Sequence, residues 1–152
     1  MRSRLFALVV LVAGLSALAV GAPAVAGPNG SACVSTTQLR AENEVPPSNS
    51  TAFGHTQIKV RNDGTIEWKT VIFNPDNETF FAGHIHRGPA GMNGPVVQFL
   101  FAGPDTTDSE ITHSGSAPNP ALAAEICANP SAFYVNYHTR ANPGGAIRGQ
   151  LK

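Results

Sequence analysis

Two histidines separated by one isoleucine, His84 and His86, form the pattern in this sequence with the clearest chemical potential. A segment rich in glycine and proline, residues 88–95, follows them directly. On a β-strand, side chains alternate between two faces, so both imidazoles would share one face, with their Cα atoms roughly 6.5–7 Å apart. Imidazoles so placed can converge on one metal ion, or each can form a hydrogen bond to the loop that follows.

A third histidine, His138, is a candidate to complete this group. It lies in an aromatic and β-branched segment, residues 133–139, in which alternation puts it on the same face as Tyr134 and Asn136. Three imidazoles suit copper or zinc, with a fourth position open to water or a substrate. Alternatively, the three form a hydrogen-bonded cluster that fixes the glycine–proline loop, with neutral rings donating to backbone carbonyls. The sequence leaves both interpretations open.

Other catalytic patterns are absent from the sequence. No serine stands in a Gly-x-Ser-x-Gly segment, and the acidic residues show no spacing that singles out a catalytic pair. His55 falls on a polar strand face and His113 falls near a predicted loop, so we expect both to be solvated. The sequence therefore predicts a protein that is not an enzyme.

The first 26 residues have the pattern of a secretory signal peptide. Arg2 and Arg4 precede an apolar stretch, residues 5–20, and Ala24-Val25-Ala26 supplies a small-residue cleavage pattern. We therefore expect cleavage after Ala26, a secreted protein of one domain, residues 27–152, and no membrane association after cleavage. Without this segment eight basic residues remain against ten acidic ones, a net charge of about −2, which does not favour binding to nucleic acid.

The two cysteines, Cys33 and Cys127, lie near opposite ends of the mature chain. In an oxidising compartment a count of two predicts one disulfide, which would close a loop of roughly 95 residues, worth about 4 kcal/mol in the chain-entropy model. Two free thiols, or a metal site of cysteine and histidine, are the alternatives.

An ion pair is predicted between Arg148 and Glu44, because a partly buried arginine needs a partner and Glu44 precedes two rigid prolines.

Alternation of apolar and polar residues predicts a mostly antiparallel β-protein. Residues 52–60 and 66–72 form its clearest hairpin, joined at Asp63-Gly64, which readily adopts the positive φ angles of tight turns. Residues 96–101 are almost continuously apolar, which predicts a strand buried on both faces or wedged between sheets. About eight short strands and one helix, residues 120–128, indicate an antiparallel Greek-key sandwich or barrel. The predicted core includes Ile58, Val60, Ile66, Trp68, Ile72, Val97 and Val135.

Spaced motifs over residues 39–151 resemble the CHRD domain, which is named for chordin and is common in bacterial secreted proteins. The matching segments are Glu44-Val45-Pro46-Pro47, His84-Ile85-His86, Gly94-Pro95-Val96-Val97, Tyr134-Val135-Asn136 with His138, and Asn142-Pro143-Gly144-Gly145 with Ile147-Arg148-Gly149. Tyr137 stands where the family usually has a valine, and we expect its ring to point outward.

This resemblance implies an immunoglobulin-like or superoxide dismutase-like β-sandwich and little about activity. It is consistent with a non-catalytic extracellular binding or structural module, whose partner would be an unknown extracellular protein or cell-envelope component. A more distant similarity to copper/zinc superoxide dismutases maps onto His84, His86, His138 and Arg148. Residues 87–95 contain no histidine and no aspartate, so a dismutase zinc subsite is missing. A metal-binding protein is the second interpretation, and a dismutase-type redox enzyme is a remote third.

Overall fold

The computed structural model describes residues 30–152, and the predicted signal peptide lies outside this range. Within this range the chain forms eight strands, one α-helix and two short 3-10 helices. None of these helices is long and apolar enough to cross a membrane. In chain order the elements are β1 (Ser31–Leu39), η1 (Ala41–Asn43), β2 (Phe53–Arg61), β3 (Thr65–Phe73), β4 (Phe80–Arg87), β5 (Val96–Thr106), β6 (Glu110–Pro118), α1 (Pro120–Ala128), η2 (Pro130–Ala132), β7 (Phe133–Thr139) and β8 (Ile147–Gln150).

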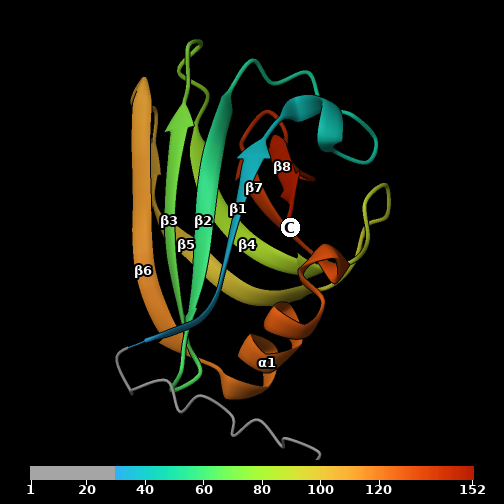
Figure 1. Ribbon diagram of the computed structural model, residues 1–152. Coiled ribbons are helices and arrows are strands. Elements are labelled where there is room, and N and C mark those ends of the chain that lie inside the picture. The colour runs from blue at the N-terminus through green and yellow to red at the C-terminus, as the bar shows by residue number, and fades with distance from the viewer. Residues whose placement is uncertain (1–29) are drawn as a thin grey trace, which may run out of the picture.

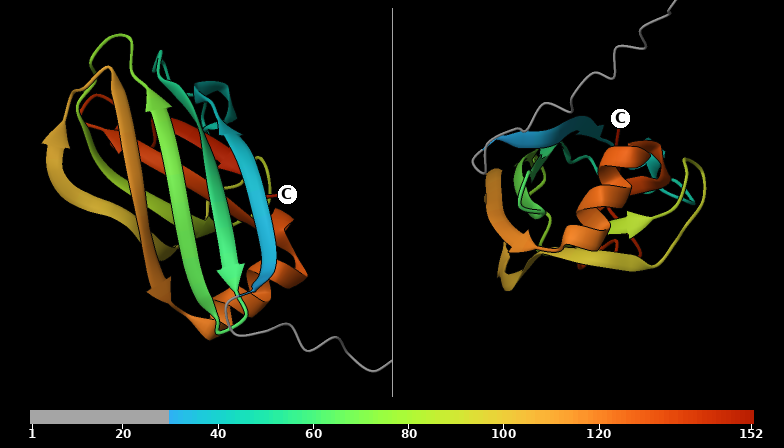
Figure 2. Two further views of the ribbon diagram at one scale, coloured as in Figure 1. Left: turned by 60° about the vertical axis from the view of Figure 1, so that its left-hand side comes forward. Right: turned by 60° about the horizontal axis from the view of Figure 1, so that its bottom comes forward.

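The strands make two four-stranded antiparallel sheets that pack face to face (Figure 1). The first sheet has the order β1-β2-β3-β6 and the second has the order β5-β4-β7-β8. Helix α1 lies at one end of the two layers, as both views of Figure 2 show. The all-β sandwich with one short helix that the sequence predicts is therefore confirmed.

The β2–β3 hairpin follows directly from the sequence pattern. Ile58 pairs with Trp68 and Val60 pairs with Ile66 across the two strands, and Gly64 in the turn has a φ of 82°. A left-handed φ of this kind costs glycine little, because glycine has no Cβ. Alternate residues of β2 are buried, so this hairpin supplies one wall of the core.

Residues from both sheets and from α1 fill the space between the layers. Five of the seven predicted core residues are buried, namely Ile58, Val60, Ile66, Ile72 and Val135. Trp68 and Val97 are only partly buried and pack against the margin of this core. Tyr137 also points inward and is completely buried, so the expectation that its ring points outward is wrong. Gly83 makes room for that ring, since a Cβ at Gly83 would come within 2.4 Å of it.

Strand β5 differs from the sequence prediction in both length and position. It continues to Thr106, five residues beyond the apolar segment 96–101 that predicted it, and it lies at the edge of its sheet. The side chain of Phe99 is 60% exposed. The apolar composition of residues 96–101 indicated burial, but Leu100 is the one residue among them that is buried, because the face that carries Phe99 is left largely uncovered.

His113 lies in strand β6 rather than in a loop. The ring of His113 stacks on Phe101, with centroids 3.8 Å apart, and also on Tyr137. Burial lowers the pKa of His113. The expectation that His113 is solvated is therefore wrong, whereas His55 is exposed as expected.

A disulfide joins Cys33 in β1 to Cys127 in α1, with their Cα atoms 5.6 Å apart. It connects residues separated by 94 positions. Leu122, Ala123 and Ile126 bury the inner side of the helix against the core. The bond therefore attaches the first strand to the helix at the end of the sandwich.

Candidate metal centre

The outer face of the second sheet is polar, yet most of it is buried. Residues directly opposite one another on neighbouring antiparallel strands share a face. His84 pairs with Asn136, and Asn136 pairs with Arg148, so these three side chains form a row across β4, β7 and β8. His86 pairs with Tyr134 in the next row. Asn136 is 3% exposed and Arg148 is 1% exposed, which is unusual for an outer face.

Loops that follow β1, β4 and β7 cover this face. The segment after β1 contacts the loop after β4 through a hydrogen bond from Asn93 Nδ2 to the Val45 carbonyl, at 2.7 Å. Ser48 Oγ donates to the Ala146 carbonyl, at 2.6 Å, and so attaches the same segment to the start of β8. These loops exclude water from a face whose strand residues are polar.

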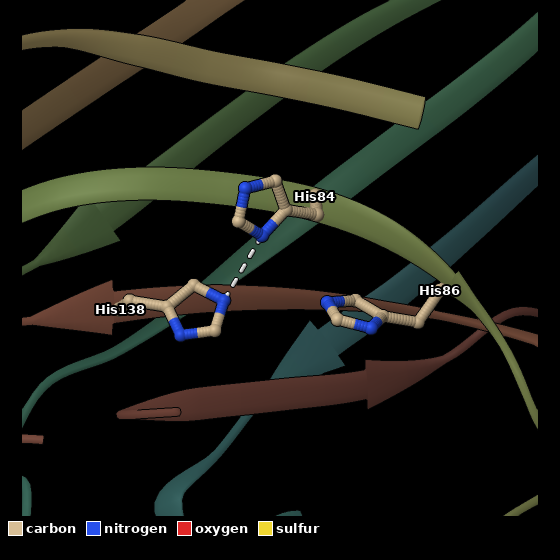
Figure 3. A group of neighbouring side chains, drawn as sticks. All are labelled: His84, His86 and His138. Carbon is tan, nitrogen blue, oxygen red and sulfur yellow. Dashed lines mark hydrogen bonds between the residues drawn. The ribbon is translucent and has the colours of Figure 1, made fainter. Parts of the chain in front are cut away.

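His84, His86 and His138 converge on this face, as Figure 3 shows. One nitrogen from each ring lies within 4.8 Å of the other two. His84 Nδ1 and His138 Nε2 are 3.0 Å apart and share a hydrogen bond. The structure thus brings together three residues that are separated by as many as 54 positions in the sequence.

Backbone carbonyls determine which nitrogen of two of these rings is free. His86 Nδ1 donates to the Gly94 carbonyl at 2.9 Å, and His138 Nδ1 donates to the Pro143 carbonyl at 3.0 Å. Because a carbonyl only accepts, both Nδ1 atoms carry hydrogen, and in a neutral ring the lone pair is on Nε2. His86 Nε2 is buried without a hydrogen-bond partner. Both Nε2 atoms point into the space between the three rings (Figure 3).

Burial keeps the three imidazoles neutral. It lowers the pKa of His84 to about 4, with further contributions from His138 and His86. Burial also lowers the pKa values of His86 and His138. A metal binds the neutral form of imidazole. Near neutral pH these rings are already neutral, so they do not have to release a proton before a metal can bind.

Aromatic rings hold the cluster from the sides. Tyr134 stacks on His86, with centroids 4.8 Å apart and planes at 9°, and its hydroxyl accepts from the Gly94 backbone N–H at 3.2 Å. The guanidinium of Arg148 lies 3.3 Å above the Tyr134 ring centroid. Phe99 contacts His84 edge-on, with centroids 4.8 Å apart. His86 is therefore fixed both by its ring face and by its Nδ1–H.

The predicted direct ion pair between Glu44 and Arg148 is not formed. The Glu44 carboxylate instead accepts two hydrogen bonds from Asn136 Nδ2, at 2.7 and 2.9 Å. Arg148 donates to the carbonyls of Pro89 and Met92 and to Asn93 Oδ1. Burial raises the pKa of Glu44 to about 7, although the positive charge of Arg148 and the hydrogen bond from Asn136 oppose this shift. The two buried charges thus interact at longer range, with Asn136 and the loop carbonyls as their direct partners.

Comparison with known proteins identifies the family. Residues 35–151 match the CHRD domain. The chain belongs to the CHRD family. No curated protein and no solved structure matches it, so the distant similarity to dismutases stays a prediction. The match covers every strand of the sandwich except the beginning of β1, and it includes His84, His86 and His138. CHRD membership suggests an extracellular binding module, and the Cys33–Cys127 disulfide is consistent with that setting.

Proposed function

We propose that this CHRD protein is a secreted, non-catalytic module that binds a copper or zinc ion through His84, His86 and His138. The observation that carries the proposal is the fixed tautomer of two of these residues. Metal-binding histidines characteristically donate their second ring N–H to a carbonyl or carboxylate, and this orients the ligand nitrogen. The Gly94 and Pro143 carbonyls accept such bonds.

The third ligand, His84, needs one adjustment. Its Nδ1 donates to His138 Nε2 when no metal is present, since that acceptor has its lone pair free. On metal binding the neutral His84 ring moves its proton from Nδ1 to Nε2, and all three lone pairs then point inward. Bonds of about 2.0–2.1 Å place ligand nitrogens about 3.3–3.5 Å apart, so the widest separation, 4.8 Å at most, has to shorten by up to about 1.5 Å.

Secretion is supported by the sequence pattern before the domain and by the disulfide. An apolar stretch after Arg2 and Arg4 has the length and flanking residues of a signal peptide. Disulfides persist mainly outside the cytosol. In that setting an exported protein meets metal ions without cytosolic competition from reduced thiols.

Titration of zinc and copper into the protein, purified without a histidine tag, tests this function. Wild type should bind one ion per chain. His86→Ala should lower the affinity at least about 100-fold, since even outer partners of metal ligands are typically worth 10–100-fold. His55→Ala is the matched control, because His55 is exposed on the other sheet, and it should bind as wild type does. Equal affinity in all three proteins, or no stoichiometric binding by wild type, would show that the histidines only hold the loops.

A further inference from the structure

The three-histidine site supplies one ligand fewer than zinc or copper(II) generally takes. Within residues 30–152, the only group of histidine, cysteine or acidic residues arranged to hold a metal contains His84, His86 and His138 alone. A tetrahedral ion bound by three protein ligands keeps a fourth position for an external molecule. The identity of that external ligand depends on the charge and the shape of the surroundings.

The surroundings favour negative charge at the fourth position. All three ligands are neutral imidazoles, so a bound dication keeps both of its positive charges. The positive charge of Arg148 also lies close to the site, because its guanidinium covers the Tyr134 ring, which stacks on His86. The buried carboxylate on this face, Glu44, is bound by Asn136 Nδ2 and is not one of the groups placed to hold the ion. Buried charge is costly unless it is compensated, and an anion bound to the metal would supply that compensation.

The accessible side of the site is next to His84. His84 is half-buried, whereas His86 and His138 are 9% and 8% exposed. Phe99, from the edge strand β5, flanks His84 and is itself 60% exposed. On the side of His138 stands Phe81, with ring centroids 6.1 Å apart. These two rings offer a ligand no hydrogen bonds, so the metal itself has to hold the ligand, which favours a small molecule that coordinates directly.

From these features we infer that the metal ion takes a small inorganic monoanion as its fourth ligand, on the side of His84 and Phe99. The inference rests on the proposed metal binding and specifies what the loaded site recognises. The anion binds the metal directly, and the ring of Phe99 borders its position. Binding involves no change in oxidation state.

Azide is a suitable probe because its coordination to copper(II) produces a charge-transfer absorption band. The full mature protein is first loaded with one equivalent of Cu²⁺ and freed of excess metal. Azide should then produce a saturable band, and the copper should stay with the protein after desalting. Chloride, added as a competing monoanion, should raise the azide concentration needed for half-saturation.

Substitution of Phe99 locates the anion. Phe99→Glu places a carboxylate beside the fourth position and should weaken azide binding at least about tenfold, by repulsion or by direct ligation. The glutamine of Phe99→Gln has nearly the same shape as the glutamate of Phe99→Glu but carries no charge. This variant should bind azide within about twofold of wild type. Phe99 is mostly exposed, so neither variant removes core packing. Copper affinity is measured for both variants before azide is added.

The results distinguish the two proposals. Tight copper binding without an azide band would overturn this inference and leave metal binding intact. Removal of copper by azide, or equal azide affinity in Phe99→Glu and Phe99→Gln, would also overturn it. Failure of copper to bind at all would overturn both proposals.

Discussion

At the scale of single residues, the histidine site depends on two carbonyl groups. The carbonyls of Gly94 and Pro143 fix the protonated nitrogen of His86 and His138 and leave the other nitrogen facing the common centre. A purely structural cluster would be expected to pair every buried nitrogen, because an unpaired polar atom is costly. The Nε2 of His86 is unpaired and lies within 4.8 Å of a nitrogen from each of two other histidines, whereas the unpaired Nε2 of His113 belongs to no such group, and this convergence favours a ligand role.

The lowered pKa values predict metal binding that resists acid. Protons compete with a metal only as the pH falls toward the folded-state pKa of each ring, which for His84 is about 4. Three histidines with ordinary pKa values near 6.5 would lose about 1,000-fold in zinc affinity between pH 7.5 and 5.5. His84 contributes almost nothing to this loss, and the lowered pKa values of His86 and His138 keep each of them below the tenfold of an ordinary histidine. We therefore expect a loss of less than about 100-fold, measured by competition with a chelator of known pH dependence. A hexahistidine peptide is the control, and a loss in the protein as large as in the peptide would contradict the prediction.

Stability is a poorer reporter of these pKa values, because two effects oppose each other. The lowered pKa of His84 means that the unfolded chain takes up a proton first, so stability falls as the pH drops from 6.5 to about 4. The raised pKa of Glu44 means that the folded chain takes up a proton first, so stability rises as the pH drops from about 7 to 4.5. Metal affinity separates the histidines from this carboxyl group.

At the scale of elements, alternation in the sequence predicted the strands well and their surroundings poorly. The β2–β3 hairpin, helix α1 and the shared face of Tyr134, Asn136 and His138 all follow from local patterns. Local patterns do not show whether both faces of a strand are covered, so the apolar residues 96–101 predicted burial, whereas Phe99 among them is 60% exposed. They also do not reveal which loop covers a face, so they gave no sign that Asn136 is the direct hydrogen-bond partner of Glu44.

The carbonyl partners of the histidines could not be found from the sequence. Every residue has a backbone carbonyl, so the roles of Gly94 and Pro143 leave no signature in residue type. The one trace of this arrangement in the sequence is the glycine at position 94. Any other residue there would place a Cβ only 1.6 Å from the Arg87 carbonyl oxygen. This contact requires the loop after β4 to turn back closely on the end of its own strand.

Gly94→Ala tests whether that loop positions His86. The added methyl group must displace the loop from the strand, so we expect a loss of about 1–3 kcal/mol in the free energy of unfolding. The Gly94 carbonyl moves with the loop, so zinc affinity should also fall at least about tenfold. Gly144→Ala is the matched control in the neighbouring loop, because a Cβ there meets nothing within 4 Å. It should change neither quantity, and unchanged zinc affinity in Gly94→Ala would show that His86 does not need this loop.

At the scale of the whole molecule, the sandwich separates its stabilising features from its candidate site. The core lies between the sheets and beneath α1, whereas the histidines occupy the outer face of the second sheet under its own loops. Tyr137 and His138 are neighbours in β7. The side chain of Tyr137 packs in the core, and that of His138 belongs to the candidate site. The scaffold can therefore lose global stability while the local geometry of the site is kept.

Removal of the disulfide tests this separation. Linking residues 94 positions apart restricts the unfolded chain, and the chain-entropy model assigns such a loop about 4–5 kcal/mol. The double variant Cys33→Ser, Cys127→Ser should therefore lose about 3–5 kcal/mol in denaturant unfolding, and reduced wild type should match it. Below its unfolding transition the variant should still bind zinc within about threefold of wild type, because the bond joins β1 to α1 and none of the histidines lies on either element. A large fall in zinc affinity in the folded variant would mean that the outer face depends on how firmly α1 closes the sandwich.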